Sequence, residues 1–97
     1  MSRFVFLGRD GPRGRALRAQ HRPAHLARWE PLDAAGRVVH GGPLLDEAGE
    51  PVGSLLVFDA PSLAEARAFA AGDPYVVEGI FAEWEVRETR AVFPKER

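Results

Sequence analysis

The spacing of apolar positions along the chain predicts four strands and two helices. Short apolar runs bounded by glycine or charge indicate strands at residues 3–9, 37–46, 51–60 and 80–93. Apolar residues that recur every three or four positions indicate helices at residues 15–35 and 62–72. The order is therefore strand, helix, strand, strand, helix, strand.

Proline and polar capping residues indicate where these helices begin and end. Pro23 is expected to begin the main part of the first helix, because proline suits the first helical turn. Pro31 is expected to kink that helix or to end it near Glu30, since an internal proline costs roughly 3 kcal/mol. A capping box that starts at Ser62 begins the second helix. Residues 73–79 are expected to form a loop with some extended character.

This order of elements is that of the ferredoxin-like βαββαβ fold, an α+β fold with an antiparallel sheet and two helices on one face. The first strand is apolar on both sides, because Phe4 and Phe6 alternate with Val5 and Leu7. The helices cover only one face of the sheet, so the second apolar face needs another cover. We therefore expect a homodimer, or a higher homo-oligomer, in which the open faces of two sheets pack together.

Length and composition narrow the class of protein. The 97 residues predict one domain, 1–97, with a frayed tail at about 94–97. The net charge of -1 gives no electrostatic reason to expect binding to nucleic acid or to an anionic membrane. We expect neither a signal peptide nor a membrane span at the start of the sequence. The absence of cysteine excludes disulfides and cysteine nucleophiles, and it fits a cytoplasmic protein.

His25, in the stretch RPAHLARW, is the first candidate for chemistry. In a helix it shares a stripe with Arg22, Trp29 and Leu32, and this stripe is expected to face the sheet. A histidine on such a face is most often a packed residue of the core. Histidine is also the side chain best suited to acid/base catalysis near neutral pH. Spacing alone leaves both interpretations open.

Three further positions carry a functional interpretation beside a structural one. Asp73 follows a helix-ending glycine and precedes a proline, which is common turn chemistry, but a carboxylate can also hold a histidine in one tautomer. Gly42 and Pro43 break a strand, which is typical of a bulge or of close backbone approach to a ligand. Ser54 lies in the neighbouring strand, where its hydroxyl could bind a ligand or satisfy a backbone group.

The sequence offers little support for a bound metal or cofactor. His21, His25 and His40 could gather a metal ion, but no H-E-x-x-H or other ligand pattern is present. His21 and His25 share a helix face only if the helix continues through Pro23. The glycine-rich stretch GRDGPRGR lacks both common nucleotide-binding motifs. We therefore expect neither a metal ion nor an organic cofactor.

The stretches RPAHLARWEPLDAAGRVVHGGPLLD and GSLLVFDAPSLAEARAFAAGDPYVVEGIF resemble the YCII-related (YciI-like) family. The shared markers are the histidine of PAHL, then GGP, GS, and DPY followed by GIF. The resemblance extends over nearly the whole chain. It implies a dimeric α+β barrel with a ferredoxin-like fold and a His–Asp pair in a cleft. A few relatives act on breakdown products of chlorinated aromatic compounds.

Carried over position by position, the resemblance places the histidine and aspartate of the family on His25 and Asp73. The Gly-Ser and Gly-Pro positions of the family fall on Ser54 and on Gly42–Pro43. Two further residues complete the set that we expect to bind substrate, namely Arg22 and Tyr75.

Three functions follow from this set. The first is a cofactor-free lyase, isomerase or hydrolase that uses His25, oriented by Asp73, on a small metabolite. The second is a binding domain with the same cleft and no turnover, and the third is an interaction domain in which the pair only joins two elements. A hydrogen bond of roughly 2.6–3.2 Å between the two side chains, beside a cavity shared with Ser54, Gly42 and Pro43, would disfavour the third.

Overall fold

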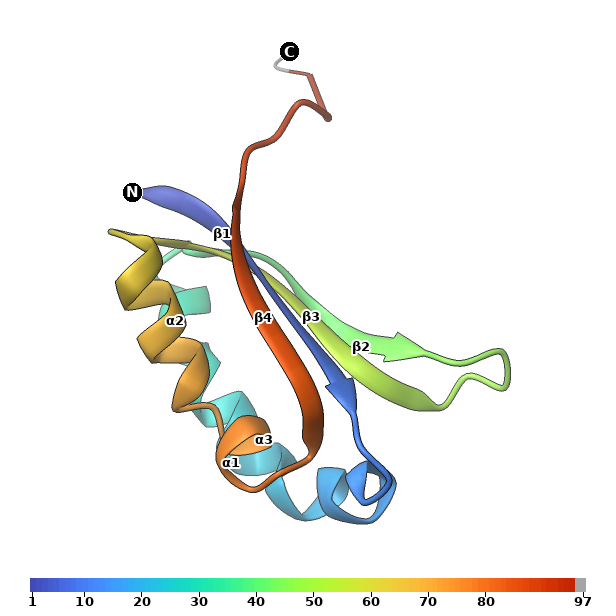
Figure 1. Cartoon of the computed structure of the whole chain (residues 1–97). Coiled ribbons are helices and arrows are strands. Elements are labelled where there is room, and N and C mark those ends of the chain that lie inside the picture. Colours follow the sequence, from blue (N-terminus) through green and yellow to red (C-terminus); the bar gives the residue numbers. More distant parts are fainter. Residues whose placement is uncertain (96–97) are drawn as a thin grey trace.

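The computed structural model describes residues 1–95, and it has the α+β order expected from the sequence, with one added short helix (Figure 1). Residues 96 and 97, part of the tail expected to be frayed, lie outside the described residues. The described elements are β1 (Ser2–Asp10), α1 (Gly14–Ala34), β2 (Val38–Leu45), β3 (Pro51–Ala60), α2 (Leu63–Ala71), α3 (Pro74–Val77) and β4 (Phe81–Thr89).

The four strands form one antiparallel sheet in the order β2-β3-β1-β4, which confirms the ferredoxin-like fold. Helices α1 and α2 lie on the same side of this sheet (Figure 1). The register places Phe4 opposite Phe58 and Phe6 opposite Leu56, and these four side chains are buried. The side of the sheet that faces the helices is therefore the hydrophobic core.

Trp29 joins α1 to this core. Its ring stacks on Phe6 with the ring centroids 6.2 Å apart, and it meets Phe58 and Phe69 edge-on at 5.0 and 4.9 Å. Aromatic pairs in such arrangements add to the free energy gained by burying their area. One indole ring thus connects α1 with β1, β3 and α2.

The opposite side of the sheet is also apolar at its centre. Val5 lies opposite Val57, and Leu7 lies opposite Leu55. All four side chains are only partly buried, and no described helix covers them. The strands therefore have the two-sided apolar character that the sequence indicates.

The predicted range of the first helix, 15–35, agrees with the structure within one residue at each end, but the boundaries expected at its two prolines were wrong. Helix α1 begins at Gly14 rather than at Pro23, and it continues through Pro31 instead of ending before it. A proline deprives the carbonyl group four residues earlier of its N–H partner, and these carbonyls belong to Ala19 and Ala27. Both alanines are exposed, so water can satisfy the two carbonyl groups and the helix tolerates both prolines.

The prediction of a loop at residues 73–79 was also wrong, because residues 74–77 form the short helix α3. Asp73 is the N-cap of this helix, and its side chain accepts a hydrogen bond from the backbone N–H of Tyr75 at 2.8 Å. Pro74 occupies the first helical position, where its missing N–H costs nothing. The Asp-Pro pair is thus a helix start rather than an isolated turn.

Strand β4 is shorter than the expected 80–93 and has a different alternation. Ile80, Ala82, Trp84 and Val86 were expected to share one face, but Ala82 is exposed and the buried residues are Ile80, Phe81 and Val86. The pairing with β1 shifts by one position between Arg9 and Asp10. This bulge turns the Phe81 ring toward the helices, where it meets Phe6 and Tyr75 edge-on.

Gly8 provides the space that Phe81 occupies, and its replacement tests this packing. A Cβ atom at Gly8 would lie 2.5–2.6 Å from three atoms of the Phe81 ring. We expect Gly8→Ala to lower the free energy of unfolding by about 1–3 kcal/mol, since an overpacked core must distort. Urea unfolding measures the change. In the control Gly42→Ala, the nearest atom would be 3.9 Å away, and equal unfolding midpoints for the two variants would contradict this account.

Candidate functional site

His25 and Asp73 meet between α1 and the start of α3. The Nδ1 atom of His25 lies 2.9 Å from each carboxylate oxygen of Asp73, which confirms the predicted contact. The Asp73 side chain is completely buried, whereas the His25 side chain is 11% exposed. The carboxylate therefore lies behind the imidazole, and only the imidazole can meet a ligand.

Three N–H groups converge on the Asp73 carboxylate. Besides Nδ1 of His25, the indole Nε1–H of Trp29 donates to it at 2.7 Å and the backbone N–H of Tyr75 donates at 2.8 Å. A buried carboxylate needs such donors to offset the loss of water. Because an ionised carboxylate only accepts hydrogen bonds, Nδ1 carries a proton, and the neutral imidazole has its lone pair at Nε2.

Tyr75 fixes the plane of the imidazole. Its ring stacks on His25 with the centroids 4.1 Å apart and an interplanar angle of 3°. Burial raises the pKa of the Tyr75 hydroxyl above its ordinary value, so the phenol stays protonated at neutral pH. The hydroxyl donates to the backbone carbonyl of Arg18 at 3.4 Å. The stacked ring of Tyr75 and one buried carboxylate thus leave His25 little freedom to rotate.

A second polar network lies on α1 about two helical turns before His25. Arg18 donates through Nε and Nη2 to the Asp10 carboxylate at 2.6 and 2.9 Å, and Nη2 also donates to Ser54 Oγ at 3.0 Å. The guanidinium lies 5.0 Å from the centre of the Tyr75 ring. This network connects α1 with β1 and β3, and it brings Ser54 to the same site as His25.

Arg18 and Asp10 were not among the site residues expected from the sequence. The signal was present, since Arg18, Arg22, His25 and Trp29 follow one another at intervals of four, three and four residues, which is one face of a helix. The stripe was traced only from Arg22 to Leu32, so Arg18, one helical turn before Arg22, was not included. Nothing in the sequence around Asp10 distinguished it from an ordinary turn residue.

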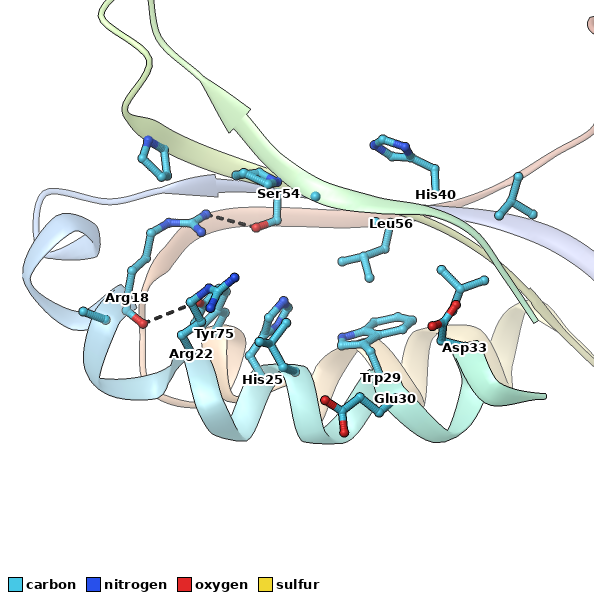
Figure 2. A pocket seen from close by; sticks show the side chains of 18 of the residues that line it. Arg18, Arg22, His25, Trp29, Glu30, Asp33, His40, Ser54, Leu56 and Tyr75 are labelled. Atoms are coloured by element: carbon cyan, nitrogen blue, oxygen red, sulfur yellow. Dashed lines mark hydrogen bonds between the residues drawn. The ribbon is translucent and has the colours of Figure 1, made fainter. Parts of the chain in front are cut away.

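A cavity of about 720 Å³ separates α1 from β2 and β3. Figure 2 shows Arg18, Arg22, His25 and Trp29 along α1, below the strands that carry Ser54 and Leu56. The volume of this cavity is in the range of small-molecule sites. Of the residues expected at the site, all except Asp73 line this cavity: His25, Ser54, Gly42, Pro43, Arg22 and Tyr75. Asp73 contributes only through the imidazole in front of it.

The free edge of His25 opens into this cavity. Its recorded hydrogen bonds are both made by Nδ1. Within residues 1–95, no buried side-chain nitrogen or oxygen lacks a hydrogen-bond partner. Nε2 therefore remains accessible, and the cavity is the space that His25 lines. The site presents an unoccupied imidazole nitrogen beside apolar walls and several polar side chains.

The histidines form no metal site in the described part of the chain. Helix α1 runs through Pro23, so His21 and His25 have the i, i+4 spacing, but no group of three His, Cys, Asp or Glu side chains comes together in residues 1–95. Figure 2 shows the His40 ring pointing away from α1. No helix in this part of the structure is long and apolar enough to cross a membrane.

Solved structures include proteins with the same architecture. The 5-chloro-2-hydroxyhydroquinone dehydrochlorinase of Burkholderia phenoliruptrix, in complex with 2,5-dihydroxybenzoquinone, is 31% identical and superposes with a TM-score of 0.80 over 91% of this chain and 93% of that one. An antibiotic biosynthesis monooxygenase is 13% identical with a TM-score of 0.58, over 95% of this chain and 99% of that one, and it shares the fold alone.

The sequence is also similar to bacterial relatives and matches a family model. Protein YciI of Escherichia coli is 32% identical over 96 residues, which cover 93% of this chain and 98% of the relative. The model of the YCII-related domain matches residues 2–90. The fold, the relatives and the matched residues agree with the resemblance seen in the sequence, and the chain belongs to the YCII-related family.

Proposed function

We propose that this protein is a cofactor-independent, cytoplasmic acid/base enzyme that acts on a small hydroxylated aromatic or quinoid compound through His25. The observation that carries the proposal is the geometry of one side chain. Nδ1 of His25 is held by a buried carboxylate at 2.9 Å, and Nε2 remains accessible in a cavity of ligand size. Asp73 is the positioning residue in this proposal, and His25 is the catalytic residue.

The chemistry follows from the tautomer. The lone pair of Nε2 takes a proton from a carbon or oxygen atom of the substrate, and the electron pair of the broken bond stays on the substrate. The imidazolium that forms carries a proton on each nitrogen, and the Asp73 carboxylate beside Nδ1–H stabilises its positive charge. The same proton then returns to the substrate at another atom, or leaves to water when a group departs with its own electron pair.

The cavity walls and one relative support a ring-shaped substrate. Trp29, Leu56 and Tyr75 line the cavity, and aromatic and aliphatic walls suit a flat ring. The Burkholderia structure, 31% identical to this chain, is a dehydrochlorinase that holds 2,5-dihydroxybenzoquinone. Loss of hydrogen chloride from a ring requires a base that accepts a proton, which is the role proposed for His25.

A binding domain with the same cavity but no turnover is the alternative. It needs the cavity and its polar groups, but it does not need an imidazole held in one tautomer by a buried carboxylate. An interaction domain needs neither feature, so the cavity beside His25 counts against it. Comparison of turnover with binding in the same preparation distinguishes the enzyme from the binding domain.

Replacement of His25 tests the proposed catalytic role. With 5-chloro-2-hydroxyhydroquinone as the first substrate, we expect His25→Gln to lower kcat by about 10²–10⁴-fold, the range typical for loss of a general acid or base. Release of chloride ion measures the rate. His21→Gln is the control, since His21 does not occur among the described residues that line the cavity. Equal rates for wild type and His25→Gln, or ring binding without turnover in the wild type, would contradict the proposal.

Replacement of Asp73 tests the tautomer without any substrate. In the wild-type protein, we expect the neutral imidazole of His25 to carry its proton on Nδ1. The carboxylate 2.9 Å away can only accept a hydrogen bond. Asp73→Asn should move a measurable fraction of that proton to Nε2, as long-range ¹H–¹⁵N spectra of the imidazole report. Asp33→Asn, an exposed cavity position, is the control. A wild-type spectrum dominated by the Nε2–H form would refute the assigned role of Asp73.

We further propose that two chains pair through the open face of the sheet. Val5, Leu7, Leu55 and Val57 form an apolar centre on that face, and its burial stabilises a complex by about 25 cal/mol per Å². Sedimentation at micromolar concentration should show a dimer or a larger oligomer, and Val57→Glu should produce monomer. Val77→Glu, at an exposed position of α3, should leave the assembly intact. A monomeric wild-type chain would rule out this pairing.

A further inference from the structure

The guanidinium of Arg18 has one nitrogen that the protein does not use. Nε and Nη2 make all of its recorded hydrogen bonds, to Asp10 and Ser54. Nη1 makes none with another described residue, and no buried side-chain nitrogen in residues 1–95 lacks a partner. Nη1 is therefore accessible although the Arg18 side chain is only 12% exposed. Since Arg18 lines the cavity, its two remaining N–H donors are available to a molecule bound there.

Ser54 is a second donor at the same end of the cavity. Its hydroxyl oxygen accepts from Nη2 of Arg18 at 3.0 Å, and the residue is 4% exposed and lines the cavity (Figure 2). A hydroxyl that accepts through its oxygen still has its own O–H to donate. Arg18 thus orients the Ser54 hydroxyl by donating to its oxygen. The O–H of Ser54 can then donate to a ligand in the cavity.

Charges around the cavity are unevenly placed along α1. Arg15 and Arg22 line it at the same end as Arg18, whereas Glu30 and Asp33 line the other end. Glu50, from the turn between β2 and β3, is the carboxylate that borders the cavity on the Ser54 side, where three arginines also line it. His25 lies between the two ends of α1. Asp10, the counterion of Arg18, does not occur among the described residues that line the cavity. A ligand at this end meets the guanidinium but not the carboxylate behind it.

We propose that the cavity binds its ligand by an anionic oxygen, which is held by Nη1 of Arg18 and by the hydroxyl of Ser54. A carboxylate, a phenolate or an enolate would satisfy this pair of donors, and charge-assisted bonds of this kind are the strong ones. The ring of such a ligand would lie along Tyr75 and His25 toward Trp29. This inference rests on the proposed function, because it names the substrate class of the same site and makes Arg18 and Ser54 its specificity-determining residues.

Two ring compounds that differ in charge but hardly in shape test the inference. The probes are 4-hydroxybenzoate, which is an anion at neutral pH, and 4-hydroxybenzamide, which is neutral. Titration followed by ¹H–¹⁵N spectra gives a Kd for each probe from the backbone amides of Arg18, His25 and Ser54. We expect the anion to bind at least about tenfold more tightly, as one hydrogen bond to a charged group provides.

Variants of the two donors test which atoms provide the selectivity. Ser54→Ala should weaken binding of the anion by about tenfold and leave the neutral probe nearly unchanged. Arg18→Gln alone would strand the Asp10 carboxylate, which is 8% exposed, so we combine it with Asp10→Asn. The double variant should bind both probes with similar Kd values. Arg87→Gln, at an exposed position of β4, should retain the wild-type preference.

The outcomes separate this inference from the proposed function. Equal affinities for the two probes, a preference that survives in the double variant, or no shift of the cavity amides with either probe would each overturn the inference. His25→Gln should keep the preference, because the anion is held by other residues. Tighter binding of the anionic probe without turnover would support the inference and refute the proposed enzymatic function. His25-dependent turnover with equal affinities for the two probes would refute the inference alone.

Discussion

The buried carboxylate of Asp73 is the interaction on which both the core and the site depend. It caps α3, accepts from the indole of Trp29 and holds Nδ1 of His25. Trp29 in turn packs against rings from β1, β3 and α2. A charge that is completely removed from water is tolerable only when several donors surround it. The imidazole N–H of His25 is one of these three donors. The hydrogen bond that helps to offset this cost therefore also fixes the position of the imidazole.

Three polar anchors hold α1 against the rest of the fold at separate points. Arg18 reaches Asp10 and Ser54 near the start of the helix, and His25 reaches Asp73 at its middle. Arg28 donates to the carbonyl of Phe69 near the end of α2. With the helix fixed in this way, the gap between α1 and β2–β3 is a feature of the native packing. A site on rigid elements keeps its geometry before a ligand arrives.

Family and fold narrow the function only in part. Proteins that share this architecture include a dehydrochlorinase and a monooxygenase, so the arrangement of strands and helices does not determine the reaction. The differences must lie in the side chains around the cavity. In this chain these side chains are the imidazole of His25, which Asp73 positions, and the guanidinium of Arg18, whose Nη1 is accessible. The third is the hydroxyl of Ser54, which Arg18 orients. These groups support the proposed proton transfer on an anionic ring compound.

The sequence by itself determined the order of the main elements and the antiparallel sheet, because these depend on local periodicity and capping residues. The periodicity left the roles of His25 and Asp73 open, and the resemblance to the YCII-related family indicated that they form a pair. Tertiary structure decided that α1 continues through both prolines and which residues join the site. Ala19 and Ala27 are exposed, so water can satisfy the carbonyl groups that the two prolines leave without an N–H partner. The continuous helix then brings Arg18 to the cavity. Ser54 meets Arg18 across 36 positions of the chain, and no local pattern encodes such a contact.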